Sequence, residues 1–433
     1  MNIIFFGIVL VAFLTASWHQ IIWVPGGGGG DISPMEALTK AIVESAAGSV
    51  ELALGLIGVM TLFLGLMKVA EAGGLLRVLA RLIRPLMVRL FPEVPPEHPA
   101  MGAMILNMSA NAMGLGNAAT PFGIRAMQEL DTLNPHHGTA TDSMALFLAI
   151  NTSSITLLPT GVIALRAAAG SADPAGILPT TLFATFCSTL IALVAAKTYA
   201  RFSRTPRDEK TVKSESQSRS AGDNPGDIPE FADQAYPVWI SAMAMGGLLT
   251  MIPLTVFYGR ALSPWIIPGL VAGFLLFGFL RRVRVYEVFV EGAKEGFQVA
   301  VRIIPFLVAI LVAVGMFRAS GAMDSLVSWI GPWTGNVGLP AEALPMALMR
   351  PLSGSGAYGI LASIINDPAI GPDSYIGYVV STLQGSTETT FYVLAVYFGA
   401  VQVRRVRHAM AAALTADLFG IIGAVAACSY LYG

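Results

Sequence analysis

Long apolar segments, almost free of charged residues, constrain the fold of this chain more than any other feature of its sequence. About 20 consecutive apolar residues are enough for an α-helix to cross the hydrocarbon core of a membrane. Only 12% of the 433 residues are charged and 55% are hydrophobic, whereas about 25% of the residues of an ordinary soluble domain are charged. The sequence therefore predicts an all-α polytopic membrane protein. The segments expected to span the membrane are residues 1–18, 52–67, 177–196, 238–257, 265–280, 303–317 and 409–430.

The remaining composition argues against several other classes of protein. A formal net charge of −1 gives no electrostatic basis for binding nucleic acid. Cys187 and Cys428 lie in separate apolar segments, so we expect no disulfide, and the five histidines show no spacing typical of metal ligands. The apolar N-terminus lacks the basic region of a signal peptide and is expected to be a retained helix. With no nucleotide-binding loop or nucleophile elbow in the sequence, we expect neither an enzyme nor a cofactor.

A charged, serine-rich segment at residues 201–233 divides the chain into two nearly equal parts. Its composition is typical of a solvated, disordered linker. The predicted domains are residues 1–200, a cytoplasmic linker at residues 201–233, and residues 234–433. Three blocks of sequence recur in the same order on either side of the linker, which indicates an internal repeat. The paired blocks are residues 64–85 with 313–332, 91–116 with 338–360, and 148–161 with 381–394.

Basic residues indicate how the two repeats are oriented. Clusters of Lys and Arg at residues 197–210, 281–284 and 404–407 are expected in the cytoplasm. The two spans between the first two clusters would then form a hairpin. The span that ends at Lys68 should travel inward, because an arginine-rich segment follows it, whereas its counterpart at residues 303–317 should travel outward. Inverted repeats with interrupted helices are typical of secondary transporters.

The arginine-rich segment, residues 75–90, predicts an amphipathic helix. Arg77, Arg81 and Arg84 recur at helical spacing with leucines on the opposite face. This pattern is typical of a helix that lies along the membrane surface. Membrane lipids are therefore expected partners, and a specific lipid head-group site is the less favoured interpretation.

Two segments rich in Gly, Ser and Asn are expected to break membrane helices. They are residues 107–123 and residues 350–359. Irregular backbone at membrane depth is tolerated only where it faces protein or water, and the helix ends exposed there can bind ions or polar solutes. The structural alternatives are close packing of small residues and, for Arg350, a side chain that reaches the membrane interface. The candidate binding residues are Asn107, Ser109, Asn111, Asn117, Arg350, Ser353 and Ser355.

A second pair of polar segments occupies equivalent positions in the two repeats. The sequence STLQGSTETTF at residues 381–391 corresponds to residues 148–158, and only the later copy carries a charge, on Glu388. Polar side chains from both repeats, with one carboxylate among them, suit a binding site in the middle of a membrane. The structural alternative for Glu388 is an ion pair with Arg350 or Arg318. The candidate binding residues are Asn151, Thr152, Ser153, Ser154, Gln384, Ser386, Thr387, Glu388 and Thr389.

These segments resemble a known family. NMSANAMGLGNAATPFG and INTSSITLLPTGVIALRAAAG are similar to spore maturation protein A, and MRPLSGSGAYGI and STLQGSTETTFYVLAVYFGAV are similar to spore maturation protein B. The chain thus resembles a fusion of the two. Both kinds of protein carry the nucleoside-recognition Gate domain, which also occurs in concentrative nucleoside transporters.

The resemblance implies Gate repeats at about residues 47–168 and 297–407 and a role in spore maturation or in the envelope. It also implies that Gln384, Thr387 and Glu388 face the substrate. The asparagine–glutamate–phenylalanine motif that nucleoside transporters use for the ribose is not clearly present. The resemblance therefore does not narrow the solute to a nucleoside.

Taken together, the sequence predicts a secondary transporter of the bacterial inner membrane with a site built from both repeats. Its solute is expected to be small and polar (anionic, zwitterionic or nucleoside-like), its coupling ion Na⁺ or H⁺, and homo-oligomerisation is left open. The alternative is a membrane scaffold or regulator of cortex or envelope assembly that keeps the Gate fold and transports nothing. A membrane enzyme that uses Glu388 as acid or base is the weakest interpretation, because no second carboxylate is visibly paired with it.

Overall fold

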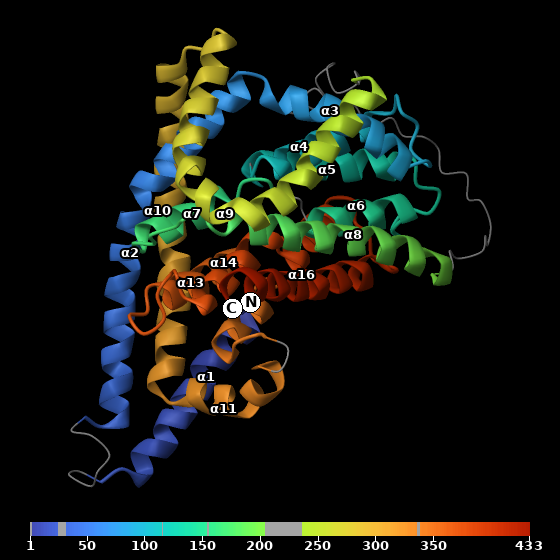
Figure 1. Cartoon of the computed structure of the whole chain (residues 1–433). Helices are drawn as coiled ribbons and strands as arrows, with labels where there is room; N and C mark the ends of the chain where they lie inside the picture. The colour runs from blue at the N-terminus through green and yellow to red at the C-terminus, as the bar shows by residue number, and fades with distance from the viewer. Residues whose placement is uncertain (1, 25–31, 115, 154–155, 204–235, 336–337) are drawn as a thin grey trace.

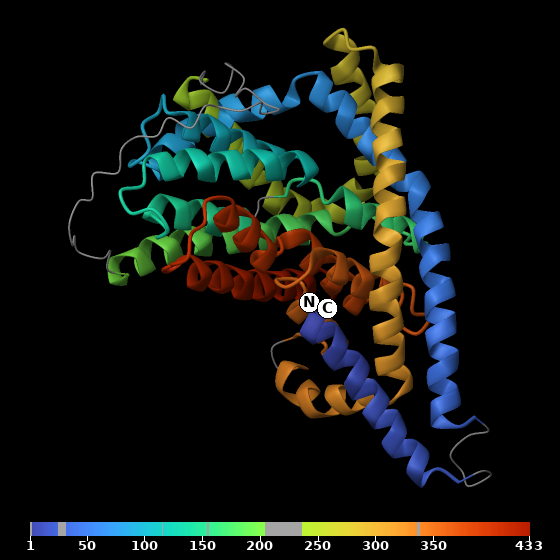
Figure 2. The ribbon, with the colours of Figure 1, turned by 180° about the vertical axis from the view of Figure 1, so that it is seen from behind.

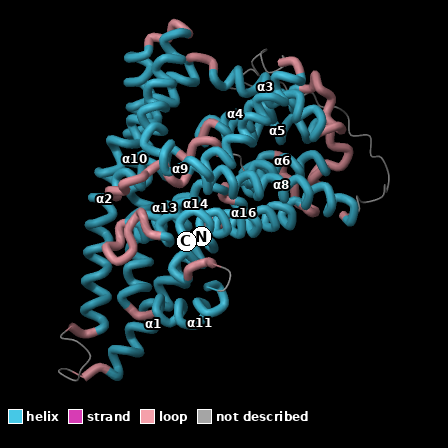
Figure 3. The backbone as a smooth tube through the Cα atoms, in the orientation of Figure 1, coloured by secondary structure: helices cyan, strands magenta, loops and turns pink. Residues whose placement is uncertain are grey.

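The computed structural model is built from α-helices, and the residues that it describes contain no β-strand (Figures 1 and 3). It describes the chain except residues 1, 25–31, 115, 154–155, 204–235 and 336–337. Helices α1, α2, α8 and α16 are each long and apolar enough to cross a membrane, which agrees with the predicted polytopic fold. Most of the predicted linker and the glycine-rich loop after α1 lie outside the described residues, so the cytoplasmic location of the linker stays a prediction.

The helices are α1 (Asn2–Ile22), α2 (Pro34–Ala72), α3 (Leu75–Leu90), α4 (Pro99–Ala112), α5 (Gly116–Thr132), α6 (Asp142–Ser153), α7 (Thr160–Ala168), α8 (Leu178–Phe202), α9 (Val238–Leu280), α10 (Val285–Ala319), α11 (Ala322–Gly335), α12 (Leu344–Met349), α13 (Gly354–Ile365), α14 (Tyr375–Ser386), α15 (Thr390–Ala400) and α16 (Ala409–Tyr432).

Two long helices, α2 and α10, pack along each other over most of their length (Figures 1 and 2). Near the end of α2, the Lys68 ammonium lies 3.0 Å from the carboxylate of Glu295. Near the start of α2, Ser45 packs against Gly315, which lies close to the end of α10. The two helices are therefore antiparallel, and small residues such as Gly315 let their backbones come close.

Both of these helices are longer than the apolar segments that predicted them, residues 52–67 and 303–317. The start of α2 is encoded locally. The Ser33 hydroxyl accepts a hydrogen bond from the backbone N–H of Glu36, and Pro34 occupies the first turn, both of which favour a helix start. The outer turns of α2 and α10 contain charged residues, so a search for long apolar segments does not include them.

A second pair of helices, α8 and α16, is also antiparallel. At one end, the hydroxyl of Tyr432 donates to the carbonyl of Gly176 at 2.5 Å. At the other end, Arg407 donates to the carbonyl of Ser203 at 2.8 Å. Because α2 and α8 of the first half of the chain run opposite to α10 and α16 of the second half, the two halves are inverted, as predicted.

The chain between the two halves differs from the expectation in one respect. Residues 238–257 and 265–280 were expected as two separate spans, but they form the single helix α9. The apolar sequence continues across the expected turn, and Pro264 lies within it. A proline kinks a helix without necessarily ending it.

Both ends of α9 nevertheless lie on the side of the molecule where α3 lies. Just before α9, the backbone N–H of Tyr236 donates to the carbonyl of Arg81 in α3. Close to its other end, Phe277 packs against Gly73, immediately before α3. Figure 1 shows one limb of α9 descending from α3 and the other rising to the start of α10. The helix is thus sharply bent into two diverging limbs rather than folded into the expected hairpin of two separate spans.

The arginine-rich segment forms α3, as predicted. Gly74 separates it from α2 with φ of 87°, a left-handed conformation that favours glycine. Arg84 is buried and donates to the carbonyl of Pro96 at 3.0 Å. Arg84 therefore holds the following loop, and the membrane-surface location of α3 stays a prediction.

Candidate functional site

Each of the four polar segments singled out in the sequence coincides with a helix break. The breaks lie between α4 and α5, α6 and α7, α12 and α13, and α14 and α15. At the last of them Thr387 is extended, with φ −137° and ψ 165°. The break after α6 and the break after α14 occupy equivalent positions in the two repeats.

These two equivalent breaks meet. The backbone N–H of Glu388 donates to the carbonyl of Thr152 at 2.8 Å. The hydroxyl of Thr189 in α8 donates to the carbonyl of Ser153 at 3.3 Å. We call Thr152, Ser153 and residues 387–390 the polar junction. Polar segments that are 233 positions apart in the sequence are therefore brought together, as the repeat predicted.

Asparagines beside the junction form a network that reaches into the second repeat. The side-chain amide of Asn107 donates to the hydroxyl of Tyr397 at 3.0 Å, and that of Asn111 donates to Oδ1 of Asn151 at 2.9 Å. The Tyr397 hydroxyl also lies 3.5 Å from Asn151 Oδ1. Oδ1 of Asn107 is buried and has no hydrogen-bond partner among the described residues. Asn107 is itself fully buried, and its amide also donates to the carbonyl of Ala119 at 2.7 Å.

Arg350 shapes the break between α14 and α15. It is only 6% exposed, so it does not extend to a membrane interface. Its guanidinium donates to the carbonyl of Thr387 and, at 3.1 Å, to the hydroxyl of Thr389. The first bond satisfies a backbone carbonyl that has no helical partner at the break, and the second holds the side chain of Thr389 beside it. Arg350 is thus first a positioning residue for the polar junction.

The carboxylate of Glu388 is not tightly bonded to either of the arginines considered from the sequence. Its side chain is 43% exposed, and its carboxylate lies 3.7 Å from the Arg350 guanidinium, a separation longer than a hydrogen bond. Arg318, the other partner considered from the sequence, lies 2.6 Å from Asp367. The expected alternative of an ion pair with Arg318 is therefore wrong. Glu388 is therefore only loosely paired with Arg350, and its side chain stays partly exposed.

Several predicted hydroxyls are already bonded within their own helices. Each donates to a backbone carbonyl three or four residues earlier, so its proton is not free for a solute. These residues are Ser109, Thr152, Ser153 and Ser386. The side chain of Asn117 and the whole of Ser154 lie outside the described part of the chain.

The remaining predicted residues lie close to the breaks. Ser353 accepts a hydrogen bond from the backbone N–H of Gly356 at 3.0 Å and so caps α13, and its hydroxyl lies 3.5 Å from that of Ser355. Gln384 is 4% exposed, and its Oε1 has no hydrogen-bond partner among the described residues. Within that part of the chain, no three His, Cys, Asp or Glu side chains gather as metal ligands would.

The site also contains residues that the sequence did not single out. Tyr397 joins the asparagine network, and Tyr358 lies close to Gln384. Asp417 of α16 accepts a hydrogen bond from Thr390 at 2.6 Å and is 4% exposed. Asp417 could have been predicted from the sequence as a candidate site residue, because it is a carboxylate inside an apolar span. Tyr358 and Tyr397 could not have been predicted in this way, because the sequence contains many aromatic residues in apolar segments and nothing distinguishes these two.

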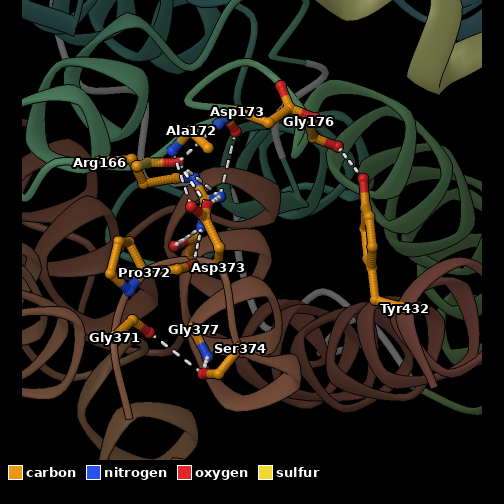
Figure 4. A network of polar contacts seen from close by, with 12 residues as sticks. Arg166, Ala172, Asp173, Gly176, Gly371, Pro372, Asp373, Ser374, Gly377 and Tyr432 are labelled. Carbon is orange, nitrogen blue, oxygen red and sulfur yellow. Dashed lines mark hydrogen bonds and ion pairs between the residues drawn. The ribbon is translucent and has the colours of Figure 1, made fainter. Parts of the chain in front are cut away.

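A fully buried arginine ties the two repeats together at one end of the α8–α16 pair (Figure 4). Arg166 is 0% exposed, and it donates to the carbonyl of Pro372 at 2.6 Å and to the carboxylate of Asp373 at 2.9 Å. Its guanidinium lies 4.3 Å from the ring centroid of Tyr378. The hydroxyl of Ser171 also donates to Asp373. We call these five residues the Arg166 cluster.

A second arginine cluster also joins the two repeats, but here the arginine belongs to the second repeat and the carboxylate to the first. The guanidinium of Arg407, in the second repeat, lies 2.7 Å from the carboxylate of Asp142, in the first. It also donates to the carbonyls of Ala140 and Ser203. We call these four residues the Arg407 cluster. In each cluster, an arginine of one repeat pairs with a carboxylate at or just before the start of α6 or α14 in the other.

The two clusters lie at opposite ends of the α8–α16 pair. Tyr432, at the end of α16, bonds to Gly176 beside the Arg166 cluster (Figure 4), whereas Ser203 of the Arg407 cluster directly follows α8. The 25 residues of α8 correspond to about 37 Å, more than the roughly 30 Å of a membrane core. A membrane crossed by these helices would therefore have one cluster near each face and the polar junction between them.

The fold and the site define a helical membrane protein with two inverted repeats that meet at a polar junction. The family model for the Gate domain, described as nucleoside recognition, matches residues 53–169 and 300–404. The chain belongs to this Gate family.

Curated relatives agree with this membership. The chain is 46% identical over 172 residues to spore maturation protein B of Bacillus subtilis strain 168, in an alignment that covers 40% of this chain and 96% of the relative. It is 44% identical over 160 residues to spore maturation protein A of the same strain, which covers 37% of this chain and 82% of the relative. It is also 31% identical over 94 residues to the inner membrane protein YjiG of Escherichia coli K12, covering 21% of this chain and 59% of that protein. The resemblance to a fusion of spore maturation proteins A and B is thereby confirmed.

Proposed function

We propose that this protein is a secondary transporter of the bacterial inner membrane that moves a small polar solute by alternating access. The observation that carries this proposal is the meeting of two helix breaks from inverted repeats, joined by the 2.8 Å bond between Glu388 N–H and the Thr152 carbonyl. Broken helices at the interface of inverted repeats commonly form the binding sites of secondary transporters.

The two arginine clusters supply closing contacts for such a cycle. Each joins one repeat to the other at one end of α8 and α16, through the pairs Arg166–Asp373 and Arg407–Asp142. If the repeats rock against each other, opening one cluster exposes the polar junction on that side while the other cluster stays closed.

The unpartnered groups around the junction favour a solute with both hydrogen-bond donors and acceptors. Buried oxygens of Asn107 and Gln384 have no partner among the described residues, and Glu388 is partly exposed. These oxygens accept from N–H or O–H groups, while Nε of Arg350, which has no described partner, can donate. A zwitterionic or nucleoside-like solute fits this set better than a simple anion. Na⁺ or H⁺ remains the coupling ion.

Thermal unfolding of the purified protein with a panel of nucleosides, nucleobases, amino acids and dicarboxylates tests this function. A solute that binds the folded state raises the Tm, because its binding adds RT ln(1 + L/Kd), where L is the free solute concentration, to the free energy of unfolding. We expect stabilisation by at least one zwitterionic or nucleoside-like compound, and the same shift in Asp324→Asn, a matched variant at an exposed site on α11. If no compound in the panel raises the Tm, the result would favour the scaffold alternative.

A further inference from the structure

A buried carboxylate beside the polar junction lacks a direct counter-charge. Asp417 is 4% exposed. Its Oδ2 accepts a hydrogen bond from the hydroxyl of Thr390 at 2.6 Å. Its Oδ1 has no hydrogen-bond partner among the residues that the structure describes. An ionised carboxylate in such surroundings is far more costly than a neutral acid.

The arginine near Asp417 directs its hydrogen bonds elsewhere. Arg350 lies within electrostatic range of Asp417, but its guanidinium donates to Thr387 and Thr389 and lies 3.7 Å from Glu388. Among the described residues, no ion pair within 4.0 Å includes Asp417. The polar junction and the side chains beside it therefore include one cation, Arg350, and two carboxylates, Glu388 and Asp417, so that one negative charge is left over if both carboxylates ionise.

The elements packed against α16 offer no other cation to balance this charge. These elements are α8, α6, α14 and α15. Lys197 and Arg201 of α8 are exposed near its last turn. The remaining titratable groups on these elements are neutral or acidic. They are Cys187 and Tyr199 of α8, Asp142 of α6, Tyr375 and Tyr378 of α14, and Tyr392 and Tyr397 of α15.

We propose that Asp417 is a proton-binding site, and that in this conformation it is a neutral acid with the proton on Oδ1. A proton taken up from water forms the O–H bond at Oδ1 and removes the uncompensated charge. A metal cation fits less well, because hard cations need several oxygen ligands and Oδ1 has no described polar partner. The consequence rests on the proposed function: in a transporter, Asp417 couples solute movement to H⁺, and it exchanges its proton when the polar junction opens to water.

Infrared difference spectroscopy of the purified full-length protein at neutral pH tests the protonation directly, whether or not the protein transports anything. The wild-type spectrum minus that of Asp417→Asn should show the carbonyl stretch of one carboxylic acid. The matched subtraction with Asp324→Asn, an exposed aspartate, should show the antisymmetric stretch of an ionised carboxylate instead. If the Asp417 subtraction also shows an ionised carboxylate, the proposal is overturned.

Stability provides a second, independent arm. Asparagine resembles a neutral aspartic acid in shape, so Asp417→Asn should unfold at a Tm close to that of the wild type. Asp417→Glu should keep a carboxylic acid band at a shifted position. Failure of Asp417→Asn to fold, together with an ionised carboxylate in Asp417→Glu, would show that the charge itself is needed and would contradict the proposal.

Discussion

The Arg166→Gln substitution should destabilise the protein by about 1.5–3 kcal/mol, because it removes hydrogen bonds made by a fully buried charged group, whereas its partner Asp373 is 37% exposed and stays partly hydrated. Arg166 is 0% exposed and bonds to the carboxylate of Asp373 and to the carbonyls of Pro372 and Asp173. A glutamine lacks the charge and the reach to satisfy all three. Each carbonyl left without a donor in a buried site adds to the loss. The measurement is the Tm in detergent, with the amount of protein recovered from the membrane.

The exposed pair of Lys40 and Glu44 is the matched control. Their charged atoms are 3.8 Å apart, and their side chains are 60% and 67% exposed. Exposed pairs of this kind contribute about 0–1 kcal/mol, so Lys40→Gln should leave the Tm nearly unchanged. An Arg166→Gln variant as stable as Lys40→Gln would contradict the structural role of the Arg166 cluster.

Substitution of Glu388 should separate binding from stability. Glu388→Gln keeps the size of the side chain and removes its charge, and the carboxylate makes no hydrogen-bond-length contact with Arg350. We expect a folded protein with a near wild-type Tm that has lost the stabilisation by any solute identified in the panel. Because one or more hydrogen bonds to a charged group would be lost, the Kd should rise about 10-fold or more.

Arg350 should respond in the opposite way. Arg350→Gln leaves the Thr387 carbonyl without its donor and Thr389 without a partner, so the variant should fold poorly even without a solute. The double variant Glu388→Gln with Arg350→Gln should be no more stable than Arg350→Gln alone. If Glu388→Gln is itself unstable and the second substitution rescues it, the pair is structural and Glu388 is not a binding residue.

Much of the fold follows from patterns that are local or repeated in the sequence. Apolar segments predicted α8 and α16 closely, since residues 177–196 and 409–430 fall almost wholly within these helices. The glycine- and serine-rich segments predicted the helix breaks, because such residues weaken a helix wherever they occur. Helix α9 shows the limit of this approach, because local proline chemistry alone does not decide between a kink and a turn.

The contacts between the two repeats could not be predicted in the same way. Arg166 lies in the segment ALRAAAG, and its sequence neighbours do not indicate its partner Asp373, which is 207 positions away. Asp417 was visible as a charged residue in an apolar span, but its proximity to Thr390 depends on how α16 packs against the break. The sequence predicts where a residue lies within its repeat, but it does not predict which atoms of the other repeat the side chain contacts.

Solvent access to the polar junction from each side of the membrane tests the central claim most directly. The first variant carries Ser355→Cys as its only cysteine, because Cys187 and Cys428 are both replaced by serine. It is reconstituted in sealed vesicles, so that either side of the membrane can be exposed to a reagent. A second version carries Thr139→Cys and Arg405→Cys, whose backbones form a bridge beside the Arg407 cluster at a spacing that a disulfide can close. Alternating access predicts that a membrane-impermeant thiol reagent labels position 355 from both sides, and that the disulfide blocks labelling only from the side of the Arg407 cluster. Labelling from one side only, or from neither side in the unlocked protein, would contradict the account.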